Sequence, residues 1–211
     1  MMEGRRSSVS RLFSVCGVLV TLFILFSCTG CSGAKLNPCS KTSTEFIKNS
    51  CRRTLYPQVC VESLSAYAST IQESPKLLAQ VALSVSLKSA RSTEKLVLNL
   101  SKVNDIRPRE AAALMDCVET MGDCVEELRQ SLQEMKHLGG PDFALKLSNI
   151  KTWVSAALTN EDTCRDGFQD KSMNGNIKNT ITKSIDYVAK LTSNALALIN
   201  NIQPSNTPNS P

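Results

Sequence analysis

The sequence predicts an all-α fold, an up-down-up-down four-helix bundle preceded by an N-terminal helical hairpin. The first observation is that apolar residues recur at steps of three and four, the period of one helix face, along four long segments, of which the one at residues 78–100 is weaker and has Ser89 and Ser92 in its middle. The second is that the joints at residues 104–108 and 138–142 are short, which makes consecutive helices antiparallel neighbours. The third is that no strand pattern competes with the helical one.

Residues 1–33 have the pattern of a secretory signal peptide. Cationic residues precede an apolar run at residues 12–26, which is too short to span a bilayer comfortably, and small residues then lead to a cleavage site near Gly33 or Ala34. We therefore expect a secreted protein with no membrane attachment after cleavage. The alternatives are a signal anchor, or a lipoprotein signal cut before Cys31, but a cysteine stands where a lipoprotein signal usually has leucine.

The composition of the mature chain argues against nucleic-acid binding. Removal of residues 1–33 discards three arginines and one glutamate, so the formal charge falls from +5 to about +3. The chain has three Tyr and one Trp, and its basic residues do not form runs interleaved with aromatics. About 178 residues remain, enough for a single domain with a sizeable core. Secretion makes disulfides the default use of the remaining cysteines.

The first folded segment, residues 40–71, is predicted to be a helical hairpin broken at Pro57. Cys51 and Cys60 flank this break, so a disulfide between them would staple the hairpin and contribute roughly 2 to 3 kcal/mol in the chain-entropy model. A zinc site is the weaker interpretation, because metal ligands are usually two to four residues apart and the sole histidine, His137, is distant.

Residues 74–202 are predicted to form the four long helices, and residues 203–211, rich in proline and polar residues, a disordered tail. The fourth stripe runs for about seven turns, and the joint at 161–174 is expected to be longer than the others. In order, the stripes are Leu78, Ala82, Val85, Leu96 and Leu100; Leu114, Val118, Met121, Val125, Leu128, Leu132 and Met135; Phe143, Leu147, Ile150, Val154 and Ala157; and Ile177, Ile181, Ile185, Val188, Leu191, Ala195, Leu198 and Ile202.

The remaining cysteines leave two pairings open. Cys117 lies on the second long helix and Cys164 just beyond the predicted third, where antiparallel packing could bring them together for roughly 4 kcal/mol. Cys124 follows Cys117 by one heptad on the same face and is the rival partner for Cys164. Cys39 is left as a thiol in the N-terminal segment.

Catalytic chemistry has little support in this sequence. It contains no Gly-x-Ser-x-Gly elbow, no His-Glu-x-x-His and no glycine-rich phosphate loop, and one histidine cannot supply a metal pair. We therefore predict neither an enzyme nor a cofactor or metal site. The carboxylates of the second long helix indicate a solvent face or a surface for a partner, and Asn99 opens a glycosylation sequon; these carboxylates are Asp116, Glu119, Asp123, Glu126 and Glu127.

Three sequence elements carry a resemblance to a known family. They are the cysteines around Pro57, the stretch AAALMDC at residues 111–117 and the stretch TWVSAALTNEDTC at residues 152–164. Over residues 40–202 the chain resembles the plant invertase and pectin methylesterase inhibitor family. The resemblance implies a hairpin and a four-helix bundle with two disulfides, Cys51 to Cys60 and Cys117 to Cys164, which leaves Cys124 free.

The function implied by the resemblance is that of a secreted inhibitor of pectin methylesterase in the apoplast and cell wall. It would dock non-covalently, one to one, over the pectin-binding cleft and so modulate demethylation of cell-wall pectin. Acid invertase is the alternative target, but inhibitors of that type carry Pro-Lys-Phe where this chain has Pro141, Asp142 and Phe143, and an aspartate would be repelled by a glycosidase's carboxylates. An alternative of another class is a helical protein that binds acidic pectin weakly through its positive charge.

Helix phase and the family's mode of docking indicate polar positions on the outer faces of three bundle helices as partner contacts. These are Lys88, Arg91, Ser92, Glu119, Thr120, Asp123, Thr152 and Thr159.

Overall fold

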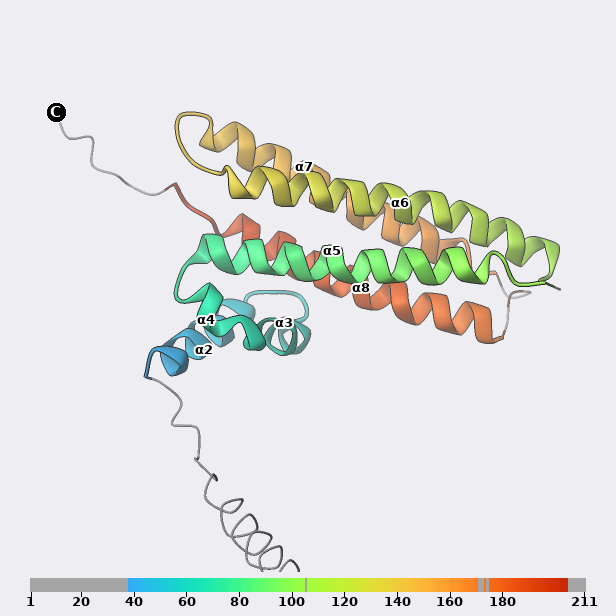
Figure 1. Ribbon diagram of the computed structural model, residues 1–211, viewed down its shortest axis with the longest axis horizontal. Coiled ribbons are helices and arrows are strands. Elements are labelled where there is room, and N and C mark those ends of the chain that lie inside the picture. The colour runs from blue at the N-terminus through green and yellow to red at the C-terminus, as the bar shows by residue number, and fades with distance from the viewer. Residues whose placement is uncertain (1–37, 105, 171–172, 174, 205–211) are drawn as a thin grey trace, which may run out of the picture. The chain divides into compact units, whose positions relative to one another are not determined.

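The computed structural model describes residues 38–104, 106–170, 173 and 175–204, with residues 38–40 described by their backbone alone. The expected signal peptide at residues 1–33 and the expected tail beyond Pro204 lie outside these residues. Every regular element within them is a helix, which confirms the predicted all-α class (Figure 1).

The N-terminal part is a set of short helices held at one end of the bundle. Helix α2 (Pro38–Cys51) is followed by α3 (Pro57–Leu64), a single 3₁₀ turn and the one-turn α4 (Ala68–Ile71). Proline at the first position of α3 suits a helix start, because that position needs no amide donor. The Cys51–Cys60 disulfide, with Cα atoms 5.6 Å apart, joins the end of α2 to α3 across the intervening turn.

The bundle consists of α5 (Pro75–Leu100), α6 (Pro108–Lys136), α7 (Phe143–Asp166) and α8 (Asn176–Asn200). Both α5 and α6 begin on proline, and the Ser74 hydroxyl caps α5 by accepting the Leu77 amide at 3.3 Å. Gly139 and Gly140 both have positive φ in the short turn between α6 and α7, a conformation that glycine adopts without steric cost.

Each long helix packs against its two neighbours in sequence order around the bundle, so that α5 also contacts α8 (Figure 1). The four predicted stripes face the interior: none of their residues is exposed, and each stripe includes fully buried residues. This is the predicted up-down-up-down bundle, and its core is built from all four helices.

The end of the third long helix was predicted wrongly. Helix α7 continues to Asp166, so the joint predicted to begin at 161 begins later and Cys164 lies inside the helix. Glu161 and Cys164 are both buried and extend the stripe of Ile150, Val154 and Ala157, while Arg165 forms an ion pair with Asp162 across 2.7 Å along the helix surface. Tertiary packing therefore maintains helix in a segment that reads as polar.

The described residues form two disulfides, the number expected from the family resemblance. The second joins Cys117 of α6 to Cys164 of α7, with Cα atoms 4.5 Å apart. Cys124 is the free cysteine of the described side chains and is buried. Cys39 belongs to α2, and its side chain lies outside what is described.

The N-terminal helices are tied to the bundle through one asparagine. Asn194 of α8 is buried; its Nδ2 donates to the Tyr56 carbonyl at 2.9 Å and its Oδ1 accepts the Tyr56 amide at 3.0 Å. Lys190, one turn before it on α8, places its Nζ 5.8 Å from the centre of the Tyr56 ring. The turn between α2 and α3 is thus fixed on the face of α8.

Candidate partner-binding surface

The eight residues predicted as partner contacts lie on the outer faces of α5, α6 and α7. Seven of them are exposed, and Thr120 is half-buried. They are accessible because the interior stripe of each helix places the positions between its members outward. The structure distributes seven of the eight over three distinct features, and Thr120, which donates its hydroxyl to the Asp116 carbonyl of its own helix, lies outside them.

The first feature is a basic groove between α5 and α6. It is a hollow of about 350 Å³ lined by Ser84, Leu87, Lys88, Arg91, Ser92 and Lys95 of α5 and Leu132 of α6. Its three cations recur at positions i, i+3 and i+7 of one helix face. Among the described residues none of these cations has a carboxylate within ion-pair distance, so the groove presents unneutralised positive charge.

The second feature is an acidic ridge on α6, formed by Asp116, Glu119 and Asp123, all exposed. Glu127, one turn after Asp123, lies at the boundary with α7, where its Oε2 accepts a hydrogen bond from Asn160 Nδ2 at 3.0 Å. Burial raises the pKa of Glu127, and the nearby charge of Asp123 raises it further. The ridge is therefore a region of concentrated negative charge.

Glu126, exposed on the same helix, is held by a different set of partners. Arg129 donates from Nε at 2.7 Å and Gln130 donates from Nε2 at 2.8 Å, and these hydrogen bonds, that of Arg129 first, lower the pKa of Glu126 to about 2. This carboxylate is therefore engaged within the protein and is less available to a partner.

The third feature is a hydroxyl row along the outer face of α7. It consists of Ser148, Thr152, Ser155, Thr159 and Thr163, all exposed and spaced by three or four residues. Each threonine donates its hydroxyl to the carbonyl four residues earlier, at 3.0, 3.2 and 2.8 Å respectively. The row is uncharged and its threonine donors are already satisfied, so these threonines offer methyl groups and acceptor lone pairs to a partner.

The structure brings together only part of the predicted set. Lys88, Arg91 and Ser92 share the basic groove, whereas the acidic ridge and the hydroxyl row lie on neighbouring helices, α6 and α7, which the hydrogen bond from Asn160 to Glu127 connects. No hydrogen bond or ion pair between described residues connects the groove to the ridge. The predicted surface is therefore a charged mosaic rather than one compact site.

Sequence reasoning missed several members of these features. Lys95 and Ser84 stand seven residues after and four residues before Lys88, so the helical period alone could have placed them in the groove. Ser148 and Ser155 could have been found in the same way from Thr152. Leu132 could not, because its place in the groove depends on the packing of α6 against α5.

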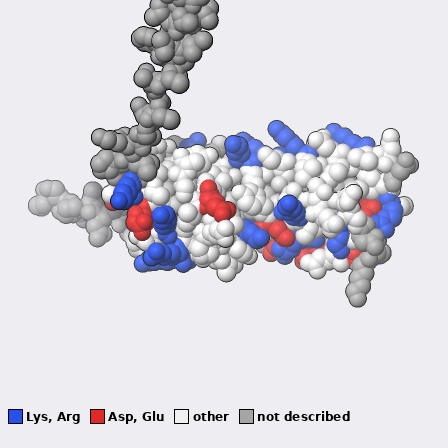
Figure 2. Space-filling view, turned by 90° about the horizontal axis from the view of Figure 1, so that it is seen from below, with Lys and Arg blue, Asp and Glu red and all other residues white. Residues whose placement is uncertain are grey.

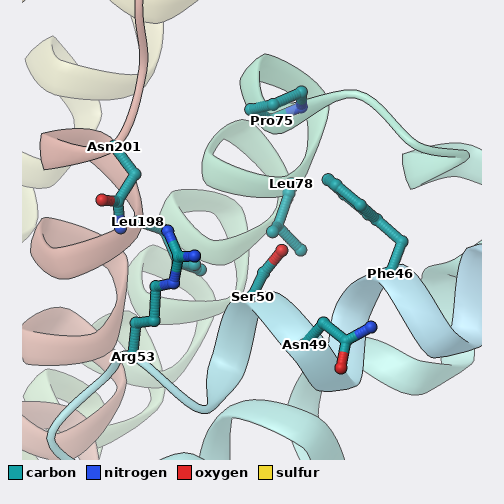
Figure 3. A pocket seen from close by; sticks show the side chains of 8 residues that line it. All are labelled: Phe46, Asn49, Ser50, Arg53, Pro75, Leu78, Leu198 and Asn201. Carbon is teal, nitrogen blue, oxygen red and sulfur yellow. The ribbon is translucent and has the colours of Figure 1, made fainter.

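Two further hollows carry no predicted contact. One, of about 300 Å³, lies between α2 and the bundle, with Phe46, Pro75 and Leu78 on its apolar side and Arg53, Asn49 and Asn201 among its polar residues (Figure 3). The other lies on α8 and is lined by Lys178, Asn179, Thr182, Lys183, Ser184, Asp186, Tyr187 and Lys190. Figure 2 shows basic and acidic side chains mixed and separated by uncharged surface on the face seen from below.

The described part of the chain holds no group of three His, Cys, Asp or Glu side chains that could bind a metal ion. None of its helices is both long and apolar enough to cross a membrane.

Comparison with known proteins gives a consistent result. The family model described as plant invertase/pectin methylesterase inhibitor matches residues 45–198. A 21 kDa protein of Daucus carota is 47% identical over 162 residues, covering 75% of this chain and 84% of that protein. Pectinesterase inhibitor 9 of Arabidopsis thaliana is 43% identical over 187 residues, covering 86% of this chain and 92% of that protein.

A solved structure shows a similar fold. The crystal structure of mutant form A of a pectin methylesterase inhibitor from Arabidopsis matches with a TM-score of 0.61 at 20% identity, covering 73% of this chain and 95% of that one. At that identity the comparison supports the fold alone.

Proposed function

Because the chain belongs to the plant invertase/pectin methylesterase inhibitor family, an inhibitor family and not a catalytic one, we propose that it is an inhibitor of pectin methylesterase. The observation that carries the proposal is the similarity to a pectinesterase inhibitor at 43% identity over 92% of that protein's length. The N-terminal pattern of residues 1–33 supports secretion to the apoplast, where cell-wall pectin is demethylated.

The proposed mechanism is non-covalent docking of one bundle on one esterase, across the cleft that binds pectin. The outer faces of α5, α6 and α7 would make the contacts, through the basic groove, the acidic ridge and the hydroxyl row. Two disulfides and the Asn194 contact hold the scaffold, so little conformational entropy is lost on binding. A mosaic of both charges favours specificity for a complementary surface over general adhesion to one polymer.

Single substitutions can test this surface. Arg91→Glu in the groove, Asp123→Lys on the ridge and Thr159→Arg in the hydroxyl row should each weaken inhibition by about tenfold or more if the residue is a central contact. Lys183→Glu on α8 is the matched control and should leave inhibition unchanged, because no predicted contact lies on that helix. Full inhibition by all three surface variants, with their folds intact, would place the contact surface elsewhere.

Acid invertase is the second target to exclude. The residue that separates the two types, Asp142, is exposed just before α7, so its charge would meet any partner at that end of the bundle. A glycosidase active site carries paired carboxylates, which an aspartate would repel. To distinguish the two targets, inhibition of acid invertase and of the esterase should be measured side by side.

Direct binding of acidic pectin is the alternative of another class. Lys178, Lys183 and Lys190 with the exposed Tyr187 on α8 are the observation that favours it, although Asp186 lies among them. Retention on polygalacturonate that is abolished by salt, without effect on any esterase, would support this alternative over inhibition.

Glycosylation at Asn99 is proposed as well. Asn99 is exposed in the last turn of α5 and follows Lys95 by four residues, so both lie on one face of the helix. A glycan there would stand at the end of the basic groove and limit how far a partner could extend along α5.

A further inference from the structure

A buried carboxyl group that has no ion pair with a cation among the described residues lies inside the bundle. Glu161 of α7 is completely buried, with 0% of its surface exposed. Its Oε1 accepts hydrogen bonds from Thr192 Oγ1 of α8 at 2.8 Å and from Cys124 Sγ of α6 at 3.3 Å. Its Oε2 is buried and has no hydrogen-bond partner among the described residues. Only one of the two oxygens of an ionised Glu161 would therefore have hydrogen-bond donors.

The charged groups around Glu161 do not compensate its charge. Glu127 of α6 and Asp162 of α7 both act on it with negative charge, and Glu94 of α5 acts in the same sense on the Cys124 thiol. The guanidinium of Arg165, one turn further along α7, is directed to Asp162 at 2.7 Å and to Asp186 at 3.8 Å. An ionised Glu161 would thus stand in an apolar, negatively charged interior.

These surroundings favour the neutral acid. Burial raises the pKa of Glu161 to about 7, even though the hydrogen bonds from Thr192 and Cys124 act in the opposite direction. Burial also raises the pKa of Cys124 far above its ordinary value, so that side chain stays a thiol and a weak donor.

The Thr192 hydroxyl can form a hydrogen bond with Glu161 whether the carboxyl group is ionised or neutral. Its hydroxyl lies 2.8 Å from Glu161 Oε1 and 3.1 Å from the Val188 carbonyl, and its single proton can go to either acceptor. When Glu161 is ionised, the proton is drawn to the carboxylate. When Glu161 is neutral, its own proton can be donated to Thr192 Oγ1, and Thr192 can donate to Val188 in the usual helical manner.

We propose that Glu161, Cys124 and Thr192 form a proton-dependent stability switch, in which the bundle folds with a neutral Glu161 and is destabilised when that carboxyl loses its proton. A group that binds its proton more tightly in the folded state stabilises the fold fully below its unfolded pKa, and this stabilisation is lost as the pH rises through the folded value. With values of 4.5 unfolded and about 7 folded, the window runs from about pH 4.5 to about pH 7.

The switch lies beneath the proposed contact surface. Glu161 is enclosed by α6, α7 and α8, and the outer faces of α6 and α7 carry the acidic ridge and the hydroxyl row. The same proton would therefore keep the surface ordered in an acidic medium and loosen it near neutral pH. The inference concerns the folding of the chain alone and does not depend on the identity of the target.

The test is a pair of urea unfolding series on the mature protein, at pH 5 and pH 8. Between pH 5 and pH 8, the folding equilibrium constant of the wild type should fall about 70 times further than that of Glu161→Gln. This variant keeps the shape of the side chain but does not titrate. Glu73→Gln, at an exposed position, is the matched control and should follow the wild type. An equal pH dependence in wild type and Glu161→Gln would overturn the proposal.

A direct titration covers the case in which Glu161→Gln fails to fold. The side-chain carboxyl signal of Glu161, followed by NMR in the wild-type protein, should have its midpoint near pH 7; a midpoint below pH 5 would overturn the proposal. Thr192→Val removes the shorter donor to the carboxylate and should lower stability more at pH 8 than at pH 5. An equal loss at both pH values would contradict the role assigned to Thr192.

Discussion

Asn194 provides a quantitative test of how the N-terminal helices are held. In Asn194→Ala the Tyr56 amide and carbonyl each lose their side-chain partner, at bonds of 3.0 and 2.9 Å. Leaving a buried polar group unpaired costs about 1 to 3 kcal/mol, and the Tyr56 groups are only partly buried, so we expect a loss of about 2 to 4 kcal/mol. For a domain of this size that lowers the melting temperature by roughly 5 to 12 °C.

The assay is urea and thermal unfolding followed by circular dichroism, together with hydrogen exchange of the Tyr56 amide. The matched control is Asn201→Ala, since Asn201 is exposed and donates to the Ala197 carbonyl of its own helix at 3.0 Å. Its loss should cost about 0.5 kcal/mol or less. If Asn194→Ala costs no more than this control, or leaves the exchange of Tyr56 unchanged, the reasoning about the tie between α8 and the hairpin is refuted.

Three further outcomes are expected. Peptide mapping without reduction should find Cys51 joined to Cys60 and Cys117 joined to Cys164, and a Cys124 to Cys164 bridge would contradict the structure. Inhibition of the esterase should weaken as the pH rises from about 5 to about 7.5, by about tenfold for each carboxylate that holds a proton one pH unit more tightly in the complex. We expect this because burial of the acidic ridge against the proposed partner would raise the pKa of its carboxylates. Dissociation constants for the esterase, measured with the Glu161→Gln variant at both pH values, separate the effect of pH on binding from its effect on folding. Equal or tighter binding at the higher pH would show that the ridge is not part of the interface. Protein expressed in plant cells should lose mass on treatment with a glycosidase and in Asn99→Gln; an unchanged mass in both would show that the sequon is not used.

The bundle could be predicted because its signal is local. Each apolar stripe lies on one helix at steps of three and four, apart from the gap between Val85 and Leu96, and the proline and glycine residues at the ends of those helices mark the boundaries. Ile177 to Ile202 illustrates this, since none of its eight stripe residues is exposed and most are buried. Because such segments are long and periodic, they restrict the fold class to one built from helices.

The Glu161 site could not be predicted from the sequence, because it is formed by residues of three helices. The helical spacing of Ile150, Val154 and Ala157 continues to position 161, and this spacing was the one sequence feature that indicated a buried position there. A glutamate at that position instead suggests that the buried face has ended. Only the packing of Thr192 and Cys124 against it shows that the carboxyl is enclosed. Likewise, the pairing of Asn194 with Tyr56 joins residues 138 positions apart, beyond any local pattern.

Only part of the proposed contact surface could be predicted, because the grouping of its residues also depends on how the helices pack. Helical phase identified exposed positions correctly, since seven of the eight predicted contacts are exposed. Phase on one helix does not say which neighbour a residue faces, so the grouping of Lys88, Arg91 and Ser92 with Leu132 came from the packing of α5 on α6. Which of these residues touch a partner stays a prediction.

The central claim is inhibition of pectin methylesterase, and one side-by-side assay tests it most directly. Purified mature protein, with both disulfides intact, is titrated into a plant pectin methylesterase acting on methylated pectin and into a plant acid invertase acting on sucrose, both at pH 5. We expect saturable loss of esterase activity with an endpoint at one inhibitor per enzyme and no change in invertase activity. Full esterase activity at saturating inhibitor, or inhibition of invertase alone, would contradict it.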